Sequence, residues 1–346
     1  MQKLIDLGER KILSEVLPDY VDNVGDDCIL VPHGHGFTVA STDPAPMPAA
    51  KALCDDGDPY WQGWLLVTIN VSDIAAMGAK PTSFMASIDL PKEYYLDNFK
   101  RLLKGIKNSC NANNISYAGG NIRESRDDDV TLVGTALGEI EGYAPVHREG
   151  ANENDHIYAV GQLGKFWSDY ATFKITNSID KKTSPIFSPI AQSTQMEILA
   201  RSGLVTAAMD VSDGLMPSLE EMSKKNQLKA IVDIDNLNSG WVDRASCNEV
   251  YGYHARAYLG WGDWCVLCSV SQSMHSTFLD CCADNEISAT KLGRFEATMD
   301  TPVVMLRTKD NEIIAGRLES ERFAKDSWFV NGIQGYVDLL RSYSLS

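Results

Sequence analysis

The segment NVSDIAAMGAKP, residues 70–81, is the stretch that decides the expected fold. It closes an apolar stretch, 61–77, whose hydrophobic residues recur at helical spacing. Gly78 follows this stretch and Pro81 lies just beyond it, which is the pattern of a helix C-terminus. We therefore predict a helix over 61–77 that carries a carboxylate, Asp73, close to its end.

Strand and helix patterns alternate on both sides of this helix, which indicates a mixed α/β or α+β architecture. In the first half we expect a second helix over 94–113 and strands at 36–42, 81–90, 116–118 and 130–140. In the second half we expect helices at 166–176 and 190–202 and strands at 156–164, 229–235 and 264–270. The last part, 272–346, gives weaker signals.

The length of 346 residues suggests two domains, because a domain usually holds about 100–200 residues. The polar segment HREGANEND, 147–155, is the expected boundary. We therefore predict an N-terminal domain over 1–146 and a C-terminal α/β domain over 147–346.

Composition and charge exclude several classes of protein. The net charge of −16 argues against sequence-independent binding to nucleic acid, which needs a basic surface. No run of about 18 apolar residues is present, so no membrane span is expected. The N-terminus does not read as a secretory signal, so we expect a cytoplasmic protein with reduced cysteines. Cys265-x-x-Cys268 lies in a strand-like run, where residues three apart face opposite sides, which favours core thiols over a metal site.

Six aspartates share one kind of position, at the edge of a predicted element: Asp26, Asp27, Asp43, Asp73, Asp210 and Asp213. Ordinary helix capping or turn formation explains any one of them alone. Together they suit a polynuclear Mg–nucleotide site, because Mg²⁺ prefers oxygen ligands and phosphoryl transfer needs charge neutralisation. Neither a Walker A pattern nor the protein-kinase motif set is present, so a phosphate site here is of another type.

A glycine pair, Gly119-Gly120, lies in YAGGNIR, 117–123, and Asn121 follows it. Glycine pairs often mark only a turn, and they also let a backbone approach a phosphate closely. The residues alone leave both interpretations open.

These motifs resemble the thiamine monophosphate kinase family. This family lies in a superfamily with aminoimidazole ribonucleotide synthetase, selenophosphate synthetase and a hydrogenase maturation factor. NVSDIAAMGAKP is the most specific match. The matching stretches follow the family's order across most of the chain: GERKIL (8–13), VGDDCIL (24–30), STD (41–43), NVSDIAAMGAKP (70–81), GG (119–120), HREGANENDHIYAVGQLG (147–164), DVSDGL (210–215) and GWGDWCVL (260–267).

The resemblance implies a two-domain, aminoimidazole ribonucleotide synthetase-like α+β fold. Its N-terminal domain would bind ATP and form a homodimer through its sheet, and several Mg²⁺ ions would hold the ATP. The implied metal ligands are Asp27, Ser41, Thr42, Asp43, Asp73, Asp210 and Asp213. The implied catalytic residues are Asp43, Asp73 and Asp210. The implied nucleotide contacts are Thr42, Gly119, Gly120, Asn121, Arg148 and Ser212. The implied acceptor-binding residues are Gly262, Asp263 and Trp264.

Three departures from the family lie at this implied site. Asn121 stands where the kinases have a metal-binding Asp, so one metal is expected to be weakened or lost. The segment 44–61 has no His, although the kinases contact thiamine phosphate with one there. Gly262 and Trp264 occupy the positions of a Glu and a Tyr in the kinase segment GGEDYEL. The motifs implied to bind nucleotide and metal mostly match those of the family, whereas the residues implied to bind the acceptor differ. We therefore favour an acceptor other than thiamine monophosphate.

Four tryptophans are candidates for lining an altered acceptor pocket, although ordinary core packing explains each of them equally well. They are Trp61, Trp64, Trp261 and Trp264.

Three functions remain open on sequence grounds. The leading one is an ATP- and Mg-dependent phosphotransferase that acts on thiamine monophosphate or on a different small-molecule acceptor, the latter being favoured. The alternative is a superfamily synthase, in which ATP activates a carbonyl or amide oxygen for attack by an amine and free phosphate is released. The third is a non-catalytic nucleotide-binding protein, which Asn121 motivates.

Overall fold

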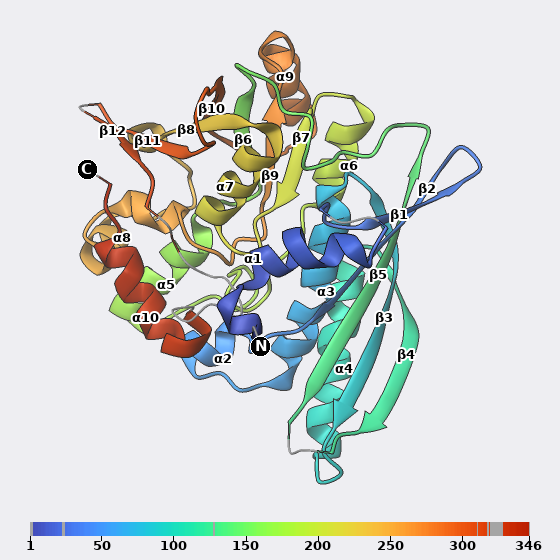
Figure 1. Ribbon diagram of the computed structural model, residues 1–346. Coiled ribbons are helices and arrows are strands. Elements are labelled where there is room, and N and C mark those ends of the chain that lie inside the picture. Colours follow the sequence, from blue (N-terminus) through green and yellow to red (C-terminus); the bar gives the residue numbers. More distant parts are fainter. Residues whose placement is uncertain are drawn as a thin grey trace.

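The computed structural model describes residues 3–22, 25–126, 129–309, 311–316, 318 and 328–345 (Figure 1). Val24, which opens the VGDDCIL motif, therefore lies outside the described residues. The described chain forms two β-sheets, one of five strands and one of seven, with helices packed on both. The expected mixed α+β architecture is confirmed.

The five-stranded sheet has the strand order β1-β2-β5-β3-β4. Its strands are β1 (Ile29–His33), β2 (Gly36–Pro44), β3 (Lys80–Leu90), β4 (Ser116–Glu124) and β5 (Thr131–Glu141). Neighbouring strands are antiparallel, except that β3 and β4 are parallel. A parallel pair needs a crossover connection, and helix α4 (Leu96–Ala112) supplies it.

The helix predicted over 61–77 is α3 (Pro59–Ala76), which follows the short helix α2 (Ala49–Cys54). The Asp58 side chain caps α3 by accepting a hydrogen bond from the Tyr60 amide at 3.0 Å. Pro59 occupies the first turn, where a missing amide donor costs nothing. The start of α3 is therefore fixed by local sequence.

Helix α3 packs with α4 on one face of the five-stranded sheet and also reaches the second sheet (Figure 1). Val67 and Ile74 belong to the core beneath the first sheet, whereas Ala75 and Ala76 join a core built on the second sheet. A helix buried between two cores is apolar on most of its sides. This position makes a polar residue on α3, such as Asp73, costly unless it has a partner.

The seven-stranded sheet has the order β12-β11-β8-β10-β6-β9-β7. Its strands are β6 (His156–Val160), β7 (Ala207–Asp210), β8 (Leu228–Asp233), β9 (Val266–Val270), β10 (Ala289–Ala297), β11 (Val304–Arg307) and β12 (Glu312–Ile314).

Helices cover both faces of the seven-stranded sheet. Alternate residues of β6 show the division, because Ile157 faces the larger core while Tyr158 faces the smaller one. The larger core includes residues of α5 (Lys165–Thr176), α7 (Leu215–Asn226), α8 (Arg244–Tyr251) and α10 (Trp328–Ser342). The smaller core includes residues of α6 (Ser193–Arg201) and α9 (His275–Asp284).

Most of the predicted elements are present, with ends that differ by a few residues. The strand expected at 116–118 is the main difference, because β4 continues to Glu124 and contains the glycine pair. The strand expected at 156–164 ends earlier, at Val160. The region of weak signals after 272 holds α9, β10, β11, β12 and α10.

Cys265 and Cys268 pack into the larger and the smaller core respectively, as their spacing predicts for a strand. All eight cysteines are free thiols. None of the helices in the described part of the chain has the length and apolarity needed to cross a membrane.

Candidate active site

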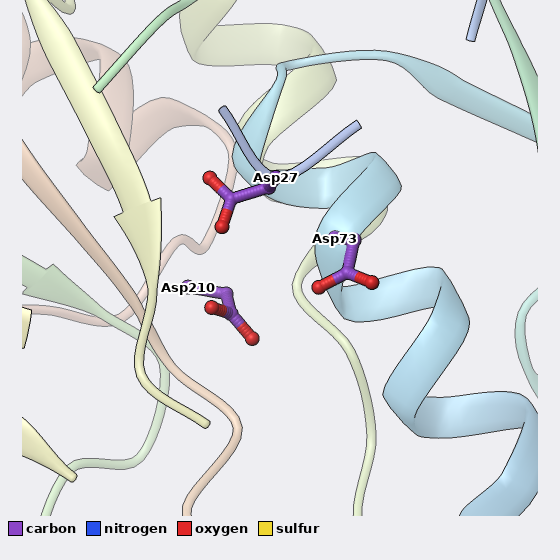
Figure 2. A group of neighbouring side chains, drawn as sticks. All are labelled: Asp27, Asp73 and Asp210. Carbon is purple, nitrogen blue, oxygen red and sulfur yellow. The ribbon is translucent and has the colours of Figure 1, made fainter. Parts of the chain in front are cut away.

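Three aspartates from distant parts of the chain meet beside the last turn of α3 (Figure 2). Asp73 belongs to this turn, Asp27 lies just before β1, and Asp210 is the last residue of β7. Each offers a carboxylate oxygen, and these oxygens lie within 4.8 Å of one another. Figure 2 shows the three side chains turned toward one shared space. We call these residues the carboxylate cluster.

Hydroxyl groups next to the cluster hold two of its members in place. The Ser41 hydroxyl, near the end of β2, donates a hydrogen bond to Oδ2 of Asp73. The Ser212 hydroxyl lies 3.3 Å from Oδ1 of Asp210, and the Ser72 hydroxyl lies 3.5 Å from Oδ2. The tripeptide Val-Ser-Asp occurs at 71–73 and at 211–213, and its two serines, Ser72 and Ser212, both lie beside the Asp210 carboxylate.

The cluster concentrates negative charge in a buried place. Burial raises the pKa of Asp73 well above its usual value, and the charges of Asp210, Asp43 and Asp27 raise it further. Burial also raises the pKa of Asp210, with a further contribution from Asp27 and an opposing one from Arg148. Buried like charges are costly when they have no counter-charge, and a bound divalent cation removes that cost.

Asp27 has one oxygen that is paired and one that is not. Arg148 donates to its Oδ1 from Nε at 3.2 Å and from Nη2 at 2.5 Å. Its Oδ2 is buried and has no hydrogen-bond partner among the described residues, and the side chain is only 1% exposed. Buried carboxylate oxygens usually have a donor or a cation beside them. The orphaned oxygen and the all-oxygen ligand set therefore fit Mg²⁺.

Asp43 reaches the site through Asn70, a buried amide on α3. The Asn70 side-chain oxygen accepts a hydrogen bond from the Asp43 amide at 2.9 Å, and its Nδ2 donates to the Leu66 carbonyl at 2.9 Å. This ties the end of β2 to α3 and brings the charge of Asp43 close to the cluster. Sequence reasoning missed Asn70, although an amide inside an apolar helix was a usable signal.

A cavity of about 690 Å³ opens onto the cluster. The predicted site residues that line it are Asp27, Ser41, Thr42, Asp43, Asp73, Arg148, Asp210, Ser212, Asp213, Gly262 and Trp264. Much of the remaining lining is apolar and includes Pro46, Met47, Trp61, Leu65, Phe166, Phe187 and Trp261. Residues predicted to bind the metal, the nucleotide and the acceptor therefore line one cavity.

One of the four tryptophans considered from the sequence has another role. Trp64 does not line this cavity, and its Nε1 donates a hydrogen bond to the Pro189 carbonyl at 2.8 Å. Trp64 therefore fastens α3 to the segment that contains Pro189.

Gly119, Gly120 and Asn121 lie on β4 and do not line the cavity in this chain. The strand register places Asp43 opposite Gly134, Gly134 opposite Ala86, and Ala86 opposite Gly120. At about 4.8 Å per strand step, Gly120 lies roughly 14 Å from Asp43. Within one chain, Asn121 therefore does not share an ion with the carboxylate cluster.

A physical reason for the second glycine is visible in β4. A Cβ on Gly120 would lie 1.8 Å from the Ala86 carbonyl oxygen, so a side chain there would separate β4 from β3. A Cβ on Gly119 would meet nothing within 4 Å. The turn interpretation of the pair is wrong, because both residues belong to a strand.

Asp263, predicted to bind the acceptor, is buried and holds the start of α5 instead. Its two carboxylate oxygens accept hydrogen bonds from the Gly164 amide at 2.6 Å and the Phe166 amide at 2.7 Å. Burial raises its pKa to about 7, and the two amide donors oppose the rise. Asp263 is absent from the cavity lining, and it acts on the site by positioning Phe166.

Asp26, one of the six aspartates noted in the sequence but not among the implied metal ligands, lies at the cavity and binds the segment that begins at His147. Asp26 accepts a hydrogen bond from the Arg148 amide at 3.0 Å, and its Oδ2 lies 2.8 Å from Nδ1 of His147. Both aspartates of the VGDD motif therefore bind the segment that begins at His147. In the sequence, this role was indicated only by the position of Asp26 directly before Asp27.

A second cavity, of about 870 Å³, shares Asp26, Arg148, Ser212 and Asp213 with the first. It lies between the N-terminal segment and α7, and Lys11, Lys224 and Lys225 contribute to its lining. The two cavities therefore adjoin at these four residues, and the second cavity is lined by cationic side chains and by acidic ones such as Glu9, Asp22 and Glu221.

Comparisons with known proteins agree with this geometry. The family model for the AIR synthase related protein, N-terminal domain, matches residues 25–140. The structure of AaThiL complexed with AMPPCP and TMP superposes with a TM-score of 0.74 at 21% identity, over 90% of this chain and 97% of that one. A crystal structure of hydrogenase maturation protein HypE gives a TM-score of 0.64 at 17% identity, over 92% of this chain and 98% of that one. The fold is thus that of the AIR synthase-like class.

Curated relatives narrow this class to one family. The thiamine-monophosphate kinase of Methanocaldococcus jannaschii is 31% identical over 223 residues, which are 60% of this chain and 67% of that protein. That of Methanospirillum hungatei is 28% identical over 310 residues, which are 85% of this chain and 96% of that protein. The chain belongs to the thiamine-monophosphate kinase family and is an ATP-dependent kinase enzyme.

Proposed function

We propose that this enzyme transfers the γ-phosphoryl group of MgATP to a small-molecule acceptor that differs from thiamine monophosphate. The observation that carries the proposal is the single cavity in which a buried carboxylate cluster adjoins an aromatic wall. Metal-holding oxygens beside a pocket for an organic molecule are what phosphoryl transfer between ATP and an acceptor requires.

Asp27, Asp73 and Asp210 are the proposed Mg²⁺ ligands, with Ser41, Thr42, Asp43 and Asp213 around them. Bound Mg²⁺ would neutralise the charge of the transferred phosphoryl group. The chain itself contributes positioning: Arg148 fixes Asp27, Asn70 fixes Asp43, and Ser41 fixes Asp73. Groups held in place before the reaction lower its barrier because they need not reorganise during it.

We assign the nucleotide to the second cavity, with its phosphates directed toward the carboxylate cluster. Lys11, Lys224 and Lys225 line that cavity together with acidic side chains such as Glu9 and Glu221, a mixture that suits a polyphosphate carrying Mg²⁺. Arg148 and Ser212 line both cavities, which agrees with the nucleotide contacts expected for them from the sequence. The acceptor would then occupy the aromatic cavity.

Two observations favour an acceptor other than thiamine monophosphate. The cavity wall contains Gly262 and Trp264, where the family resemblance implies a Glu and a Tyr. It also contains Pro46 and Met47 from the segment that has no His. Thiamine monophosphate is the second candidate, because the curated relatives are thiamine-monophosphate kinases and AaThiL was determined in complex with TMP.

We further propose a homodimer, which gives Gly119, Gly120 and Asn121 a role. β4 is an edge strand of the five-stranded sheet, and its glycine pair leaves the Gly119 side open. In a dimer formed through this sheet, β4 of one chain would lie near the nucleotide of the other chain. The variant Asn121→Asp tests this role, because it restores a carboxylate and should raise the number of bound Mg²⁺ ions measured in the presence of ATP.

Product analysis tests the proposed function. The full chain is incubated with MgATP and either thiamine monophosphate or a panel of aromatic and aliphatic phosphomonoesters, and ADP and phosphorylated products are quantified. We expect Mg-dependent phosphorylation of an acceptor other than thiamine monophosphate, abolished by EDTA. Rapid formation of thiamine diphosphate would overturn the changed acceptor. Release of ADP and free phosphate in the presence of an amine, without phosphorylated product, would instead indicate a synthase.

A further inference from the structure

The backbone of Arg148 is held by two side chains from distant parts of the chain. Its amide donates a hydrogen bond to Oδ1 of Asp26 at 3.0 Å, and its carbonyl accepts one from Nδ2 of Asn226 at 2.9 Å. Arg148 lies between β5 and β6, outside any helix or strand. The two side chains therefore supply the partners that regular secondary structure would otherwise give to its backbone.

Asn226, the last residue of α7, uses every hydrogen-bonding position of its side-chain amide. Its Oδ1 accepts from the Gly150 amide at 2.8 Å and from the Ala151 amide at 2.9 Å. Its Nδ2 donates to the Arg148 carbonyl and, at 2.8 Å, to the Met222 carbonyl. A side-chain amide has two donor and two acceptor positions, so all four are occupied. Three of these bonds fasten the segment around Arg148 to α7.

The guanidinium of Arg148 binds Asp27 from one side only. Nε and Nη2 both donate to Oδ1, at 3.2 Å and 2.5 Å, and Oδ2 has no hydrogen-bond partner in the described part of the chain. An arginine fork often gives one N–H group to each oxygen of a carboxylate instead. The position of the Arg148 backbone therefore decides whether Oδ2 of Asp27 is free for a cation.

We propose that Asp26 and Asn226 are positioning residues of this enzyme. By fixing the Arg148 backbone they keep its guanidinium on Oδ1 of Asp27, which leaves Oδ2 for a divalent cation. Without them the guanidinium would take both oxygens and compete with the cation. The inference rests on the proposed function, because it treats the carboxylate cluster as the metal site. It goes beyond that function by assigning metal affinity to two side chains that act through Arg148.

A double-mutant cycle on metal binding tests the role of Asn226 in the full chain. The probe is Mn²⁺ without nucleotide, because Mn²⁺ shares the preference of Mg²⁺ for octahedral oxygen ligands and its free form is measured by electron paramagnetic resonance. We expect Asn226→Ala to weaken Mn²⁺ binding at least tenfold, on the order found when groups that orient metal ligands are removed.

The second half of the cycle repeats the substitution in a chain that already carries Arg148→Ala. There, Asn226→Ala should change the Mn²⁺ affinity less than twofold, because the competing guanidinium is gone. A general structural role of Asn226 would weaken binding equally in both backgrounds. Equal losses in the two backgrounds would therefore overturn the inference.

Asp26 provides a test that does not depend on Asn226, at a side chain that is 31% exposed. Asp26→Ala and Asp26→Asn remove the same charge, but only the asparagine keeps an oxygen for the Arg148 amide. The asparagine nitrogen can also donate to Nδ1 of His147 in the tautomer that leaves this atom unprotonated. We expect Asp26→Ala to lose at least tenfold in Mn²⁺ affinity and Asp26→Asn to stay within twofold of the unmodified chain. Equal affinities of the two variants would contradict the proposed hydrogen bond.

The matched control for Asn226→Ala is Asn285→Ala. Asn285 follows α9 and donates from Nδ2 to the Cys281 carbonyl at 2.9 Å, four residues back, as Asn226 does to Met222. It lines neither of the two cavities. We expect Asn285→Ala to bind Mn²⁺ as the unmodified chain does, and a tenfold loss in this variant would overturn the specific role of Asn226.

Product analysis on the same variants separates this inference from the proposed function. A chain that phosphorylates an acceptor, and whose Mn²⁺ affinity is the same in all variants, overturns the inference alone. A chain whose variants lose Mn²⁺ affinity as expected, but which transfers no phosphoryl group, overturns the proposed function and leaves Asp26 and Asn226 as positioning residues of a metal site. An unmodified chain that binds no Mn²⁺ overturns both.

Discussion

At the scale of single residues, the aspartates of the site differ in the hydrogen-bond partners of their carboxylate oxygens. Asp27 gives one oxygen to Arg148 and leaves the other buried without a donor. Asp73 gives one oxygen to Ser41. Asp263, also buried, accepts hydrogen bonds from two backbone amides with its two oxygens. Hydrogen-bond partners therefore separate carboxylates placed for a cation from one that holds the fold.

Replacing Asp73 by asparagine tests the cation role of the cluster. Asp73→Asn keeps the shape of the side chain but removes one negative charge from the place where Mg²⁺ is proposed to bind. We expect the affinity for MgATP to fall at least tenfold, or about 1.4 kcal/mol, in calorimetric titrations. Affinity for ATP in EDTA should not fall, because without Mg²⁺ the substitution removes only a repulsive charge.

The matched control for this substitution is Asp97→Asn, whose parent side chain is 93% exposed and pairs with Lys100. This variant should bind MgATP as the unmodified chain does. If Asp73→Asn also keeps its MgATP affinity, the carboxylate cluster does not hold the metal.

The raised pKa of Asp210 predicts how stability without metal depends on pH. An unfolded aspartate has a pKa of about 3.9, so between that pH and the raised folded pKa the folded state binds more protons than the unfolded state. The folded state therefore loses stability as pH rises through the folded pKa, by about 1.4 kcal/mol for each unit of the shift.

Asp210→Asn removes this pH-dependent cost. In EDTA we expect the variant to be more stable than the unmodified chain at pH 8, with a smaller difference at pH 5, in urea denaturation. With Mg²⁺ the order at pH 8 should reverse, because the variant lacks a ligand and gains less from the ion. A variant that is less stable in EDTA at both pH values contradicts the charge repulsion.

At the scale of elements, β4 shows how a glycine can serve strand pairing. Gly120 faces the Ala86 carbonyl so closely that a Cβ would lie 1.8 Å from its oxygen. Gly119 faces open space, although its φ of +136° also suits glycine. The two adjacent glycines are therefore constrained by different factors, one by contact and conformation and the other by conformation alone.

Alanine substitutions distinguish these two constraints. Gly119→Ala should cost the backbone strain of a positive φ, about 1–3 kcal/mol of unfolding free energy. Gly120→Ala should cost more, because it adds a clash with β3. Equilibrium unfolding by urea measures both values. Equal losses would show that the β3–β4 contact relaxes without cost.

The sequence predicted those parts of the site that depend on local patterns. The local pattern at element edges drew attention to six aspartates, and the family resemblance singled out Asp27, Asp43, Asp73, Asp210 and Asp213, all of which line one cavity. Helix α3 was predicted because its apolar spacing and its terminal Gly78 are local features. Short elements such as β1 and α2 were missed, because they carry few residues of any pattern.

Contacts between distant segments could not be predicted in this way. Phe166 looks like an ordinary core residue in the sequence, and only the fold brings its ring against Gly262. Asp263 was expected to touch the acceptor, but its amide partners lie about a hundred residues earlier in the chain. Asn121 was placed beside the metals by resemblance, whereas the register puts β4 three strands away from β2.

At the scale of the whole molecule, the five-stranded sheet has one face covered by α3 and α4 and another that is more open. On β5, Leu132 and Ala136 are buried toward the helices, whereas Leu137 is only half-buried. On the same side as Leu137, Val31 is 51% exposed and Met85 is 38% exposed. Apolar residues grouped on an open sheet face suit contact with a second copy of the chain.

A charge on this open face tests the proposed homodimer. Val31→Lys should keep the fold, because the side chain is half exposed, and should shift the sedimentation coefficient from that of a dimer to that of a monomer. The control is Met299→Lys, which changes a fully exposed apolar residue in a loop and should leave the dimer intact. An unmodified chain that sediments as a monomer contradicts the dimer.

The contact between Phe166 and Gly262 also restricts the order in which mutations can change this enzyme. A glutamate introduced at 262 in one step would clash with the Phe166 ring, which lies 2.5 Å from the position of its Cβ. A smaller residue at 166 would have to come first, and it would open a void before any new contact formed. A residue with a side chain at 262 would also adopt the φ of +108° only with backbone strain. A sequence change that places an acidic side chain at position 262 therefore passes through a less stable intermediate sequence.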